Sequence, residues 1–351
     1  MSYARANISR MSGYVPGEQP KDKQYTKLNT NENPYPPSPK VFEALANLNP
    51  ECLRLYSEPV SRDLRGIASE WIGRSPEWAL CGNGSDDLLT IAFRTFVDQD
   101  QPVAYTMPSY SLYPVLADLQ GAQHRVVELD DHFRLPLDAA ARARGASLFI
   151  VSRPNAPTGN AFPLDAMHQL CKDFEGVLWI DEAYADFADD NCLEFVTQYP
   201  NVVVSRTLSK SYSLAGIRLG VAFANPDLIS EMMKVKDSYN VNTMTQLVGA
   251  AALRDRGYMR HIAERIRATR SKVTGELTAL GFHVLPSQAN FLLAEPPCDA
   301  EALFLALRDR GFLVRYFKQE RIRQFIRVTI GTEEQMTAFA ETVSSILAAG
   351  L

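Results

Sequence analysis

The sequence predicts an α/β protein, with a large domain built on a central, mostly parallel sheet flanked by helices and a smaller α+β domain. Short apolar runs alternate with longer helical patterns through the middle of the chain, as parallel α/β architecture requires. From about Met259 the sequence pattern changes to that of a long charged helix followed by short strands. With 351 residues, 46% of them hydrophobic, the chain can bury cores for two domains.

The central apolar runs are the expected strands of the large sheet. They lie at Pro102–Thr106, Ser147–Ser152, Val177–Asp181, Val202–Ser205 and Leu219–Ala224. Helical patterns separate them, for example Ser85–Phe96 and Leu164–Phe174.

The C-terminal part is expected to form the smaller domain. A helix over His261–Leu280 leads into strands at Asn290–Leu293, Phe312–Tyr316 and Phe325–Ile330, and a final helix follows. The proline-dense run over residues 33–39 predicts a loop. We therefore expect an N-terminal arm over residues 1–30 that packs with the small domain and the substrate site, a large domain over 31–258 and a small domain over 259–351.

Composition argues against several classes of function. The net charge of -5 is unlike a nucleic-acid-binding surface. No apolar stretch reaches the roughly 18 residues of a membrane span, and Met1 to Pro20 lacks the apolar core of a signal peptide. The five cysteines form no C-x-x-C pair and the histidines are dispersed, so we expect no metal site and a reducing, cytoplasmic setting.

The most specific motif follows the run Val202–Ser205 and extends from Thr207 to Gly220. Ligands of open parallel sheets bind outside the carboxyl ends of the strands. Lys210 lies there between small hydroxyl residues, where desolvation would lower its pKa and free the amine as a nucleophile. Thr207, Ser209 and Arg218 could hold a phosphate. A solvated surface lysine is the alternative interpretation.

A second cluster, Asp181 to Tyr184, follows the run Val177–Ile180. A carboxylate at a buried strand end needs a cation or hydrogen-bond donors, and a pyridinium nitrogen is such a cation. Tyr184 could present its hydroxyl on the same side. The alternative is an aspartate that caps the following helix.

Three weaker signals lie at other predicted strand ends. The glycines before Ser85 and Asp86 would expose backbone N–H groups at a helix N-terminus, which could bind a phosphate or could simply form an N-cap. Tyr110 could stack on a flat aromatic ligand or belong to the core. Asn155, in a turn with two prolines and a glycine, offers an amide or is part of a plain loop.

In this order the clusters resemble the aspartate-aminotransferase-like, fold-type I enzymes that depend on pyridoxal 5'-phosphate. Within them, the chain resembles the histidinol-phosphate aminotransferases. The resemblance covers most of the chain and rests on the motifs Leu28–Pro39, Gly82–Asp87, Pro108–Tyr113, Asn155–Gly159, Asp181–Tyr184, Thr207–Gly220 and Phe325–Thr332.

The resemblance implies a role for each residue of the cofactor site. Lys210 would form the Schiff base and then shuttle the proton, Asp181 would pair with the pyridine nitrogen, and Tyr110 would stack on the ring. Tyr184 and Asn155 would bond the ring hydroxyl. The phosphate would be held by Ser85, Asp86, Thr207, Ser209 and Arg218.

It also implies a shared site and a set of substrate contacts. Tyr56 would reach the phosphate of the other subunit's cofactor, so a homodimer is expected. Arg327, which shares one face of an alternating strand with Phe325 and Thr329, could bind the carboxylate or phosphate of the substrates as a bidentate donor. Arg315, Tyr14 and Asn31 are the further substrate contacts that the resemblance implies.

Two positions depart from the family pattern. Ala156 stands where the family has a second asparagine that bonds the ring hydroxyl, so either Asn155 replaces it or Tyr184 serves alone. Leu55 stands in place of the arginine that usually precedes Tyr56.

The expected reaction transfers an amino group between a phosphorylated amine and a keto acid. The subfamily resemblance implies conversion of histidinol phosphate and 2-oxoglutarate to imidazole acetol phosphate and glutamate, in histidine biosynthesis. A threonine-phosphate decarboxylase and an aromatic-amino-acid aminotransferase are the alternatives on the same scaffold. A non-enzymatic regulator that binds the cofactor is a remote one.

Overall fold

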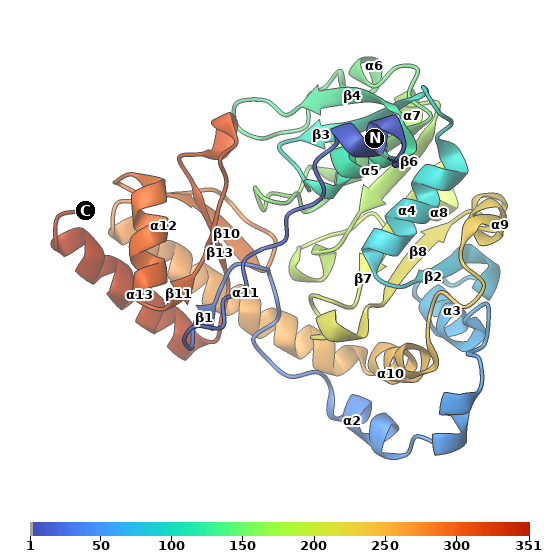
Figure 1. Cartoon of the computed structure of the whole chain (residues 1–351), viewed down its shortest axis with the longest axis horizontal. Helices are drawn as coiled ribbons and strands as arrows, with labels where there is room; N and C mark the ends of the chain where they lie inside the picture. The colour runs from blue at the N-terminus through green and yellow to red at the C-terminus, as the bar shows by residue number, and fades with distance from the viewer. Residues whose placement is uncertain (1–2) are drawn as a thin grey trace.

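The computed structural model describes residues 3–351 and contains a large and a small sheet with helices around both (Figure 1). The large sheet has seven strands in the order β2-β8-β7-β6-β5-β3-β4. Their bounds are β2 (Ala79–Gly82), β3 (Pro102–Met107), β4 (Gln123–Glu128), β5 (Leu148–Ser152), β6 (Val177–Asp181), β7 (Val202–Thr207) and β8 (Gly220–Ala224).

The large sheet is mostly parallel, as expected. Only β8 runs against its neighbours, since it pairs antiparallel with both β2 and β7. The central strands β5, β6 and β7 are almost wholly buried, which explains their continuous apolar sequences. The strands β2 and β4, at the two edges of the sheet, were not among the predicted elements.

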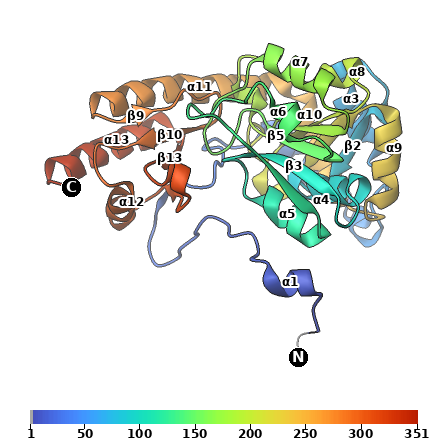
Figure 2. The same ribbon diagram turned by 90° about the horizontal axis from the view of Figure 1, so that it is seen from above.

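Helices cover both faces of this sheet (Figure 2). On one face α4, α5 and α9 pack on Val103, Ile150 and Trp179. On the other face lie α3, α7, α8 and α10. Their bounds, with those of α2 and α6, are α2 (Pro39–Ala46), α3 (Arg62–Ser69), α4 (Ser85–Phe96), α5 (Leu112–Gln120), α6 (Ala139–Arg142), α7 (Leu164–Asp173), α8 (Phe195–Gln198), α9 (Pro226–Val235) and α10 (Thr243–Arg254).

The smaller part contains an antiparallel sheet of order β12-β13-β10-β9. The expected strand over Phe312–Tyr316 is divided, because its first half pairs with the N-terminal arm and its second half with β13. The elements are α11 (Arg256–Ala279), β9 (His283–Val284), β10 (Phe291–Glu295), α12 (Ala300–Asp309), β11 (Phe312–Leu313), β12 (Arg315–Tyr316), β13 (Ile326–Thr329) and α13 (Glu333–Ala348). Since α11 begins at Arg256, the proposed domain boundary at residue 259 falls inside a continuous helix.

The N-terminal arm joins the two parts of the molecule. Its strand β1 (Thr26–Lys27) pairs in parallel with β11 of the smaller part. Its helix α1 (Ala6–Arg10) instead lies against α5 of the large part, where the Asn7 amide donates to the carbonyl of Asp118 (Figure 2). The segment between them crosses the front of the molecule and covers the carboxyl ends of the large sheet's parallel strands (Figure 1).

Candidate active site

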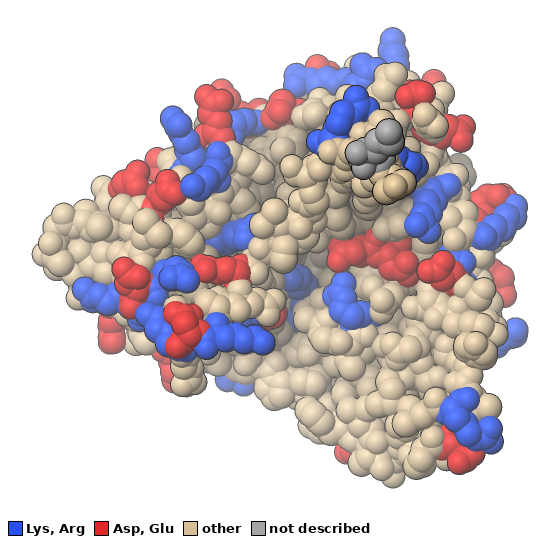
Figure 3. Space-filling model, viewed as in Figure 1, with Lys and Arg blue, Asp and Glu red and all other residues tan. Residues whose placement is uncertain are grey.

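A cavity of about 750 Å³ lies where the parallel strands end, between the two parts and beneath the arm. The molecular surface is hollowed in this region, with basic and acidic side chains around the hollow (Figure 3). Thirteen of the expected site residues line the cavity: Tyr14, Asn31, Ser85, Asp86, Tyr110, Asp181, Tyr184, Thr207, Ser209, Lys210, Arg218, Arg315 and Arg327. The fold therefore brings residues from four separate regions of the chain, 14–31, 85–110, 181–218 and 315–327, to one place.

One end of the cavity is built to receive an anion. Helix α4 begins at Ser85 after Gly84, whose φ of 89° favours glycine. A side chain at Gly84 would also come within 2.5 Å of the Arg218 guanidinium. Arg218 donates to the Ser209 hydroxyl (3.3 Å) and the Asp86 carboxylate (3.2 Å). Free backbone N–H groups beside an arginine and a serine hydroxyl suit a phosphate.

The amine of Lys210 points toward the arm and donates to the carbonyl oxygen of Thr30 (3.0 Å). Its backbone is held in place by the Asn33 amide, which donates to the carbonyls of Lys210 and Ser211. Burial lowers the pKa of Lys210 to about 8, with a further contribution from the Arg327 guanidinium. An amine with this pKa is partly unprotonated near neutral pH and can attack a carbonyl carbon.

Asp181 is a buried carboxylate with hydrogen-bond donors and no ion pair in the described chain. Tyr113 donates to its Oδ2 (2.8 Å), and the backbone N–H of Ala183 donates to its Oδ1 (3.2 Å). Burial raises the pKa of Asp181 to about 6, which the hydrogen bond from Tyr113 partly offsets. A buried anion without a cationic partner fits a bound pyridinium nitrogen.

Tyr113 was missed as a member of this site. Tyr110 lies just before α5 and Tyr113 in its first turn, and the two rings meet edge to face at 5.6 Å between centroids. Tyr110 lines the cavity and also contacts the ring of Tyr14 at 5.7 Å. The i, i+3 spacing of the two tyrosines was the sequence signal that could have indicated a second residue facing the same way.

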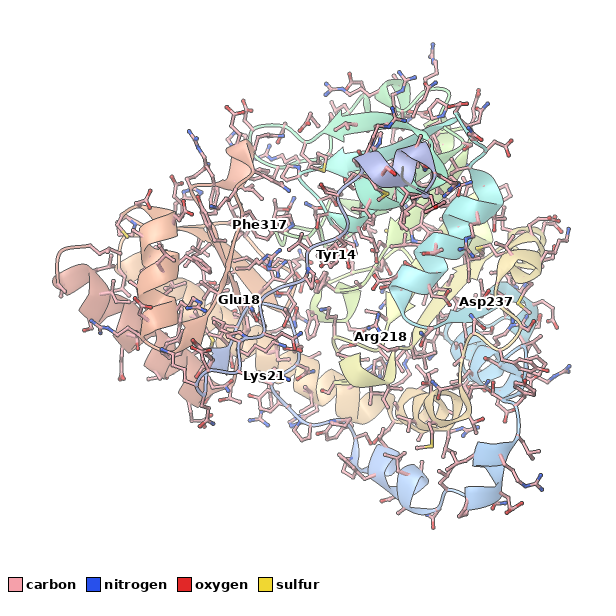
Figure 4. All side chains as sticks on the ribbon, viewed as in Figure 1. Tyr14, Glu18, Lys21, Arg218, Asp237 and Phe317 are labelled. Carbon is pink, nitrogen blue, oxygen red and sulfur yellow. The ribbon has the colours of Figure 1, made fainter. Side chains whose placement is uncertain are left out.

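The other end of the cavity carries two arginines from neighbouring strands, Arg315 on β12 and Arg327 on β13, which are cross-strand partners. Arg327 lies against the rings of Phe291 and Phe317, and it donates to the carbonyl of Asn29 (2.8 Å). Its Nε is buried without a hydrogen-bond partner in the described chain. Tyr14, Phe317 and Arg218 mark the cavity in Figure 4. This end suits an anion of the substrate.

Two expected residues do not line this cavity. Asn155 is fully buried; its amide donates to the Pro108 carbonyl and the Thr158 hydroxyl, and its oxygen accepts from Ser109. Ala156 faces the cavity in its place. The expectation that Asn155 bonds a ring hydroxyl therefore does not fit this geometry, and Tyr184 is the residue that offers a hydroxyl there.

Tyr56 is the second expected residue outside the cavity. Its side chain is 83% exposed, unlike the residues that line the site. Its ring stacks on that of Tyr239, with 4.4 Å between centroids. Leu53 and Leu55 beside it are also exposed, by 63% and 57%. Adjacent exposed apolar side chains of this size are typical of an interaction surface.

Neither a metal site nor a membrane span was found in the described part of the chain. Residues 3–351 contain no group of three or more histidine, cysteine or acidic side chains that could hold a metal ion. Over the same residues, no helix is long and apolar enough to cross a membrane.

Comparison with known proteins identifies the class of protein that this site belongs to. A model of the family "Aminotransferase class I and II" matches residues 23–343. The chain belongs to that family. It is accordingly a pyridoxal-phosphate-dependent enzyme, as the sequence predicted.

Its relatives within the family carry a more specific name. Histidinol-phosphate aminotransferase 1 of Nostoc sp. is 42% identical over 348 residues, which cover 99% of this chain and 98% of the relative. Histidinol-phosphate aminotransferase of Syntrophotalea carbinolica is 44% identical over 338 residues, or 96% of this chain and 97% of the relative.

Solved structures share the fold. The histidinol-phosphate aminotransferase of Sinorhizobium meliloti in complex with pyridoxal-5'-phosphate matches 99% of this chain and 98% of its own, with a TM-score of 0.90 and 24% identity. A mutant aspartate aminotransferase of Thermus thermophilus has a TM-score of 0.81 at 19% identity, over 99% of this chain and 100% of its own. At these identities the likeness establishes the fold-type I architecture.

Proposed function

We propose that this protein transfers the amino group of histidinol phosphate to 2-oxoglutarate, which yields imidazole acetol phosphate and glutamate, with pyridoxal phosphate as cofactor. The observation that carries the proposal is a second anion site, at Arg315 and Arg327, separate from the anion site at Arg218. The first accommodates the cofactor's phosphate. The second accommodates the substrate's, and the names of the full-length relatives support histidinol phosphate as that substrate.

The residues divide the work of one site between two half-reactions. Bound pyridoxal phosphate withdraws electrons from the bonds at the amine-bearing carbon. Asp181 keeps the ring nitrogen protonated, and Lys210 takes a proton at that carbon and returns it. Arg218, Ser209 and the start of α4 hold the cofactor's phosphate, which fixes the position of the reacting carbon relative to the Lys210 amine.

The same two arginines must serve both substrates. Histidinol phosphate carries a phosphate and no carboxylate, whereas 2-oxoglutarate carries two carboxylates. A guanidinium binds either kind of anion with two parallel hydrogen bonds. The unpartnered Nε of Arg327 and the position of Arg315 beside it support this exchange of one anion for another.

An assay with three candidate substrates tests which amine the protein uses. With pyridoxal phosphate present, incubation with histidinol phosphate and 2-oxoglutarate should form glutamate, and incubation with threonine phosphate should release no carbon dioxide. Aromatic amino acids with 2-oxoglutarate form the third arm and should give slower glutamate formation. Carbon dioxide from threonine phosphate without glutamate from histidinol phosphate would make the protein a decarboxylase instead.

We also propose a homodimer in which Tyr56 completes the partner's phosphate site. The exposed ring of Tyr56 beside Leu53 and Leu55 supports such an interface, and charged side chains are sparse over much of the surface near α2 (Figure 3). The mass in solution should be about twice 39.1 kDa. Tyr56→Phe should weaken cofactor retention by roughly tenfold, the value of one hydrogen bond to a charged group. Tyr25→Phe should not, because Tyr25 lies half-buried on the arm outside the cavity and its hydroxyl donates to Asp22. A monomeric, fully active protein contradicts this assembly.

The cellular setting that we propose is the cytoplasm. All five cysteines are unpaired in the structure, as expected for a protein of a reducing compartment.

A further inference from the structure

Asn31 occupies an unusual position between the cavity and the smaller sheet. It is buried, and its backbone adopts the left-handed conformation with φ 56°, which asparagine tolerates better than most residues. Its backbone N–H donates to Thr329 Oγ1 (3.0 Å), and its carbonyl accepts from the Asn290 amide (3.1 Å). The side chain of Asn31 is therefore held rigidly with respect to β10 and β13.

The direction of the hydrogen bonds at Asn31 follows from the number of protons. Thr329 Oγ1 accepts the Asn31 N–H, so its single hydrogen is free to be donated to Asn31 Oδ1, 3.0 Å away. The amide then has its oxygen toward Thr329 and its NH₂ toward Tyr184, where Nδ2 donates to the hydroxyl oxygen at 2.9 Å. The orientation of the amide is thus determined by Thr329.

Tyr184 is left with a hydrogen to give. Burial raises the pKa of Tyr184, which keeps the hydroxyl protonated. Its oxygen accepts from Asn31, and no other residue within 3–351 accepts the hydroxyl hydrogen. Tyr184 lines the cavity next to Ala156, a side chain that cannot donate. The hydroxyl hydrogen can therefore point into the cavity.

We propose that Thr329 is a positioning residue, which acts through Asn31 to make Tyr184 a hydrogen-bond donor to the ring oxygen of the bound cofactor. The inference rests on the proposed function, because it requires pyridoxal phosphate in the cavity. It changes the role of Asn31 from a substrate contact to the middle of a relay. Since Thr329 lies two residues from Arg327 on β13, one strand carries both the relay and the substrate's anion site.

The relay has a spectroscopic consequence. A hydrogen bond donated to the ring oxygen stabilises its negative charge, so the nitrogen that joins Lys210 to the cofactor holds its proton less tightly. The visible absorbance band of the cofactor-loaded protein reports that proton. Loss of the donated hydrogen bond should move the pH midpoint of the band upward.

The test compares Thr329→Val, which keeps the shape but removes the hydroxyl, with Thr329→Ser, which keeps the hydroxyl. We expect Thr329→Val to raise the midpoint by roughly 0.5 to 1 pH unit, as loss of one hydrogen bond would, and Thr329→Ser to leave it unchanged. In a Tyr184→Phe background the same valine substitution should have no further effect. The relay is overturned if Thr329→Val leaves the midpoint unchanged. It is also overturned if Thr329→Val shifts the midpoint by the same amount in the Tyr184→Phe background.

Asn31→Asp provides a second route if the valine variant does not fold. A carboxylate still accepts from Thr329 but cannot donate to Tyr184, so Tyr184 must donate to it and turn away from the ring oxygen. The midpoint should rise more than in Thr329→Val, and an unchanged midpoint would again overturn the relay. A wild-type protein that shows no visible band with pyridoxal phosphate would overturn the proposed function and the relay together. A visible band whose midpoint does not change in these variants would overturn the relay alone, so the two failures are distinguishable.

Discussion

Lys210→Ala is expected to lower the rate of transamination by at least about 10³-fold, because one side chain supplies both the covalent attachment and the catalytic base. The buried amine has a pKa of about 8 and lies at the carboxyl end of the large sheet, on a backbone that Asn33 fixes. Lys318 also lines the cavity, but it lies on the exposed segment after β12 and pairs with Glu301, so it should not replace Lys210 as the attachment point or the base. The measurement is glutamate formation from histidinol phosphate and 2-oxoglutarate.

A second measurement separates attachment from catalysis. Borohydride reduction should fix the cofactor to the wild-type protein and leave the Lys210→Ala protein unlabelled, as read by intact mass. Lys234→Ala is the matched control, because that lysine is exposed on α9 and pairs with Glu231, three residues away. A Lys210→Ala protein that keeps full activity would disprove the role of this residue.

The strands of the large sheet were predictable where their sequences are dictated by burial on both faces. The strands β5, β6 and β7 begin with apolar runs, Leu148–Val151, Val177–Ile180 and Val202–Val204, because helices cover both of their faces. The edge strand β4 is exposed over most of its length and has no such run, whereas β2 is buried and apolar but only four residues long, too short to stand out in the sequence. The reversed direction of β8 is a property of its pairing with β7 and β2, which a local sequence pattern does not contain.

The candidate site was predictable to the extent that its residues follow strands directly. Asp181 ends β6, and Lys210 comes three residues after β7. Arg315 and Arg327 are twelve residues apart in the sequence and become neighbours only because β12 pairs with β13. Their spacing does not indicate this, so the prediction that they act together came from the resemblance. The position of Asn155 outside the cavity follows from its partners, the Pro108 carbonyl and Ser109, which come from another loop and leave no local signal.

Asp181→Asn is expected to lower turnover by roughly 10² to 10⁴-fold, the equivalent of removing one partner of a buried ion pair, about 3–5 kcal/mol. The two residues have the same shape, but an amide does not hold a proton on the ring nitrogen. Both carboxylate oxygens accept hydrogen bonds, from Tyr113 and from the Ala183 N–H. The asparagine can keep its oxygen toward Ala183 while Tyr113 turns to accept from its NH₂, so the fold should survive.

The stability of the protein prepared without cofactor gives an independent prediction for the same variant. In the wild-type protein without cofactor, the folded pKa of about 6 exceeds the ordinary value of 3.8, so the folded state binds the proton more tightly than the unfolded state. Stability of that protein should therefore fall as the pH rises from about 4 to 6, and this fall should be smaller in Asp181→Asn. Asp173→Asn, on the exposed end of α7, is the control and should retain both activity and the wild-type pH profile. Since the carboxylate is costly only while it lacks a cation, added pyridoxal phosphate should raise the melting temperature of the wild type more than that of Asp181→Asn, and equal stabilisation would refute the pairing.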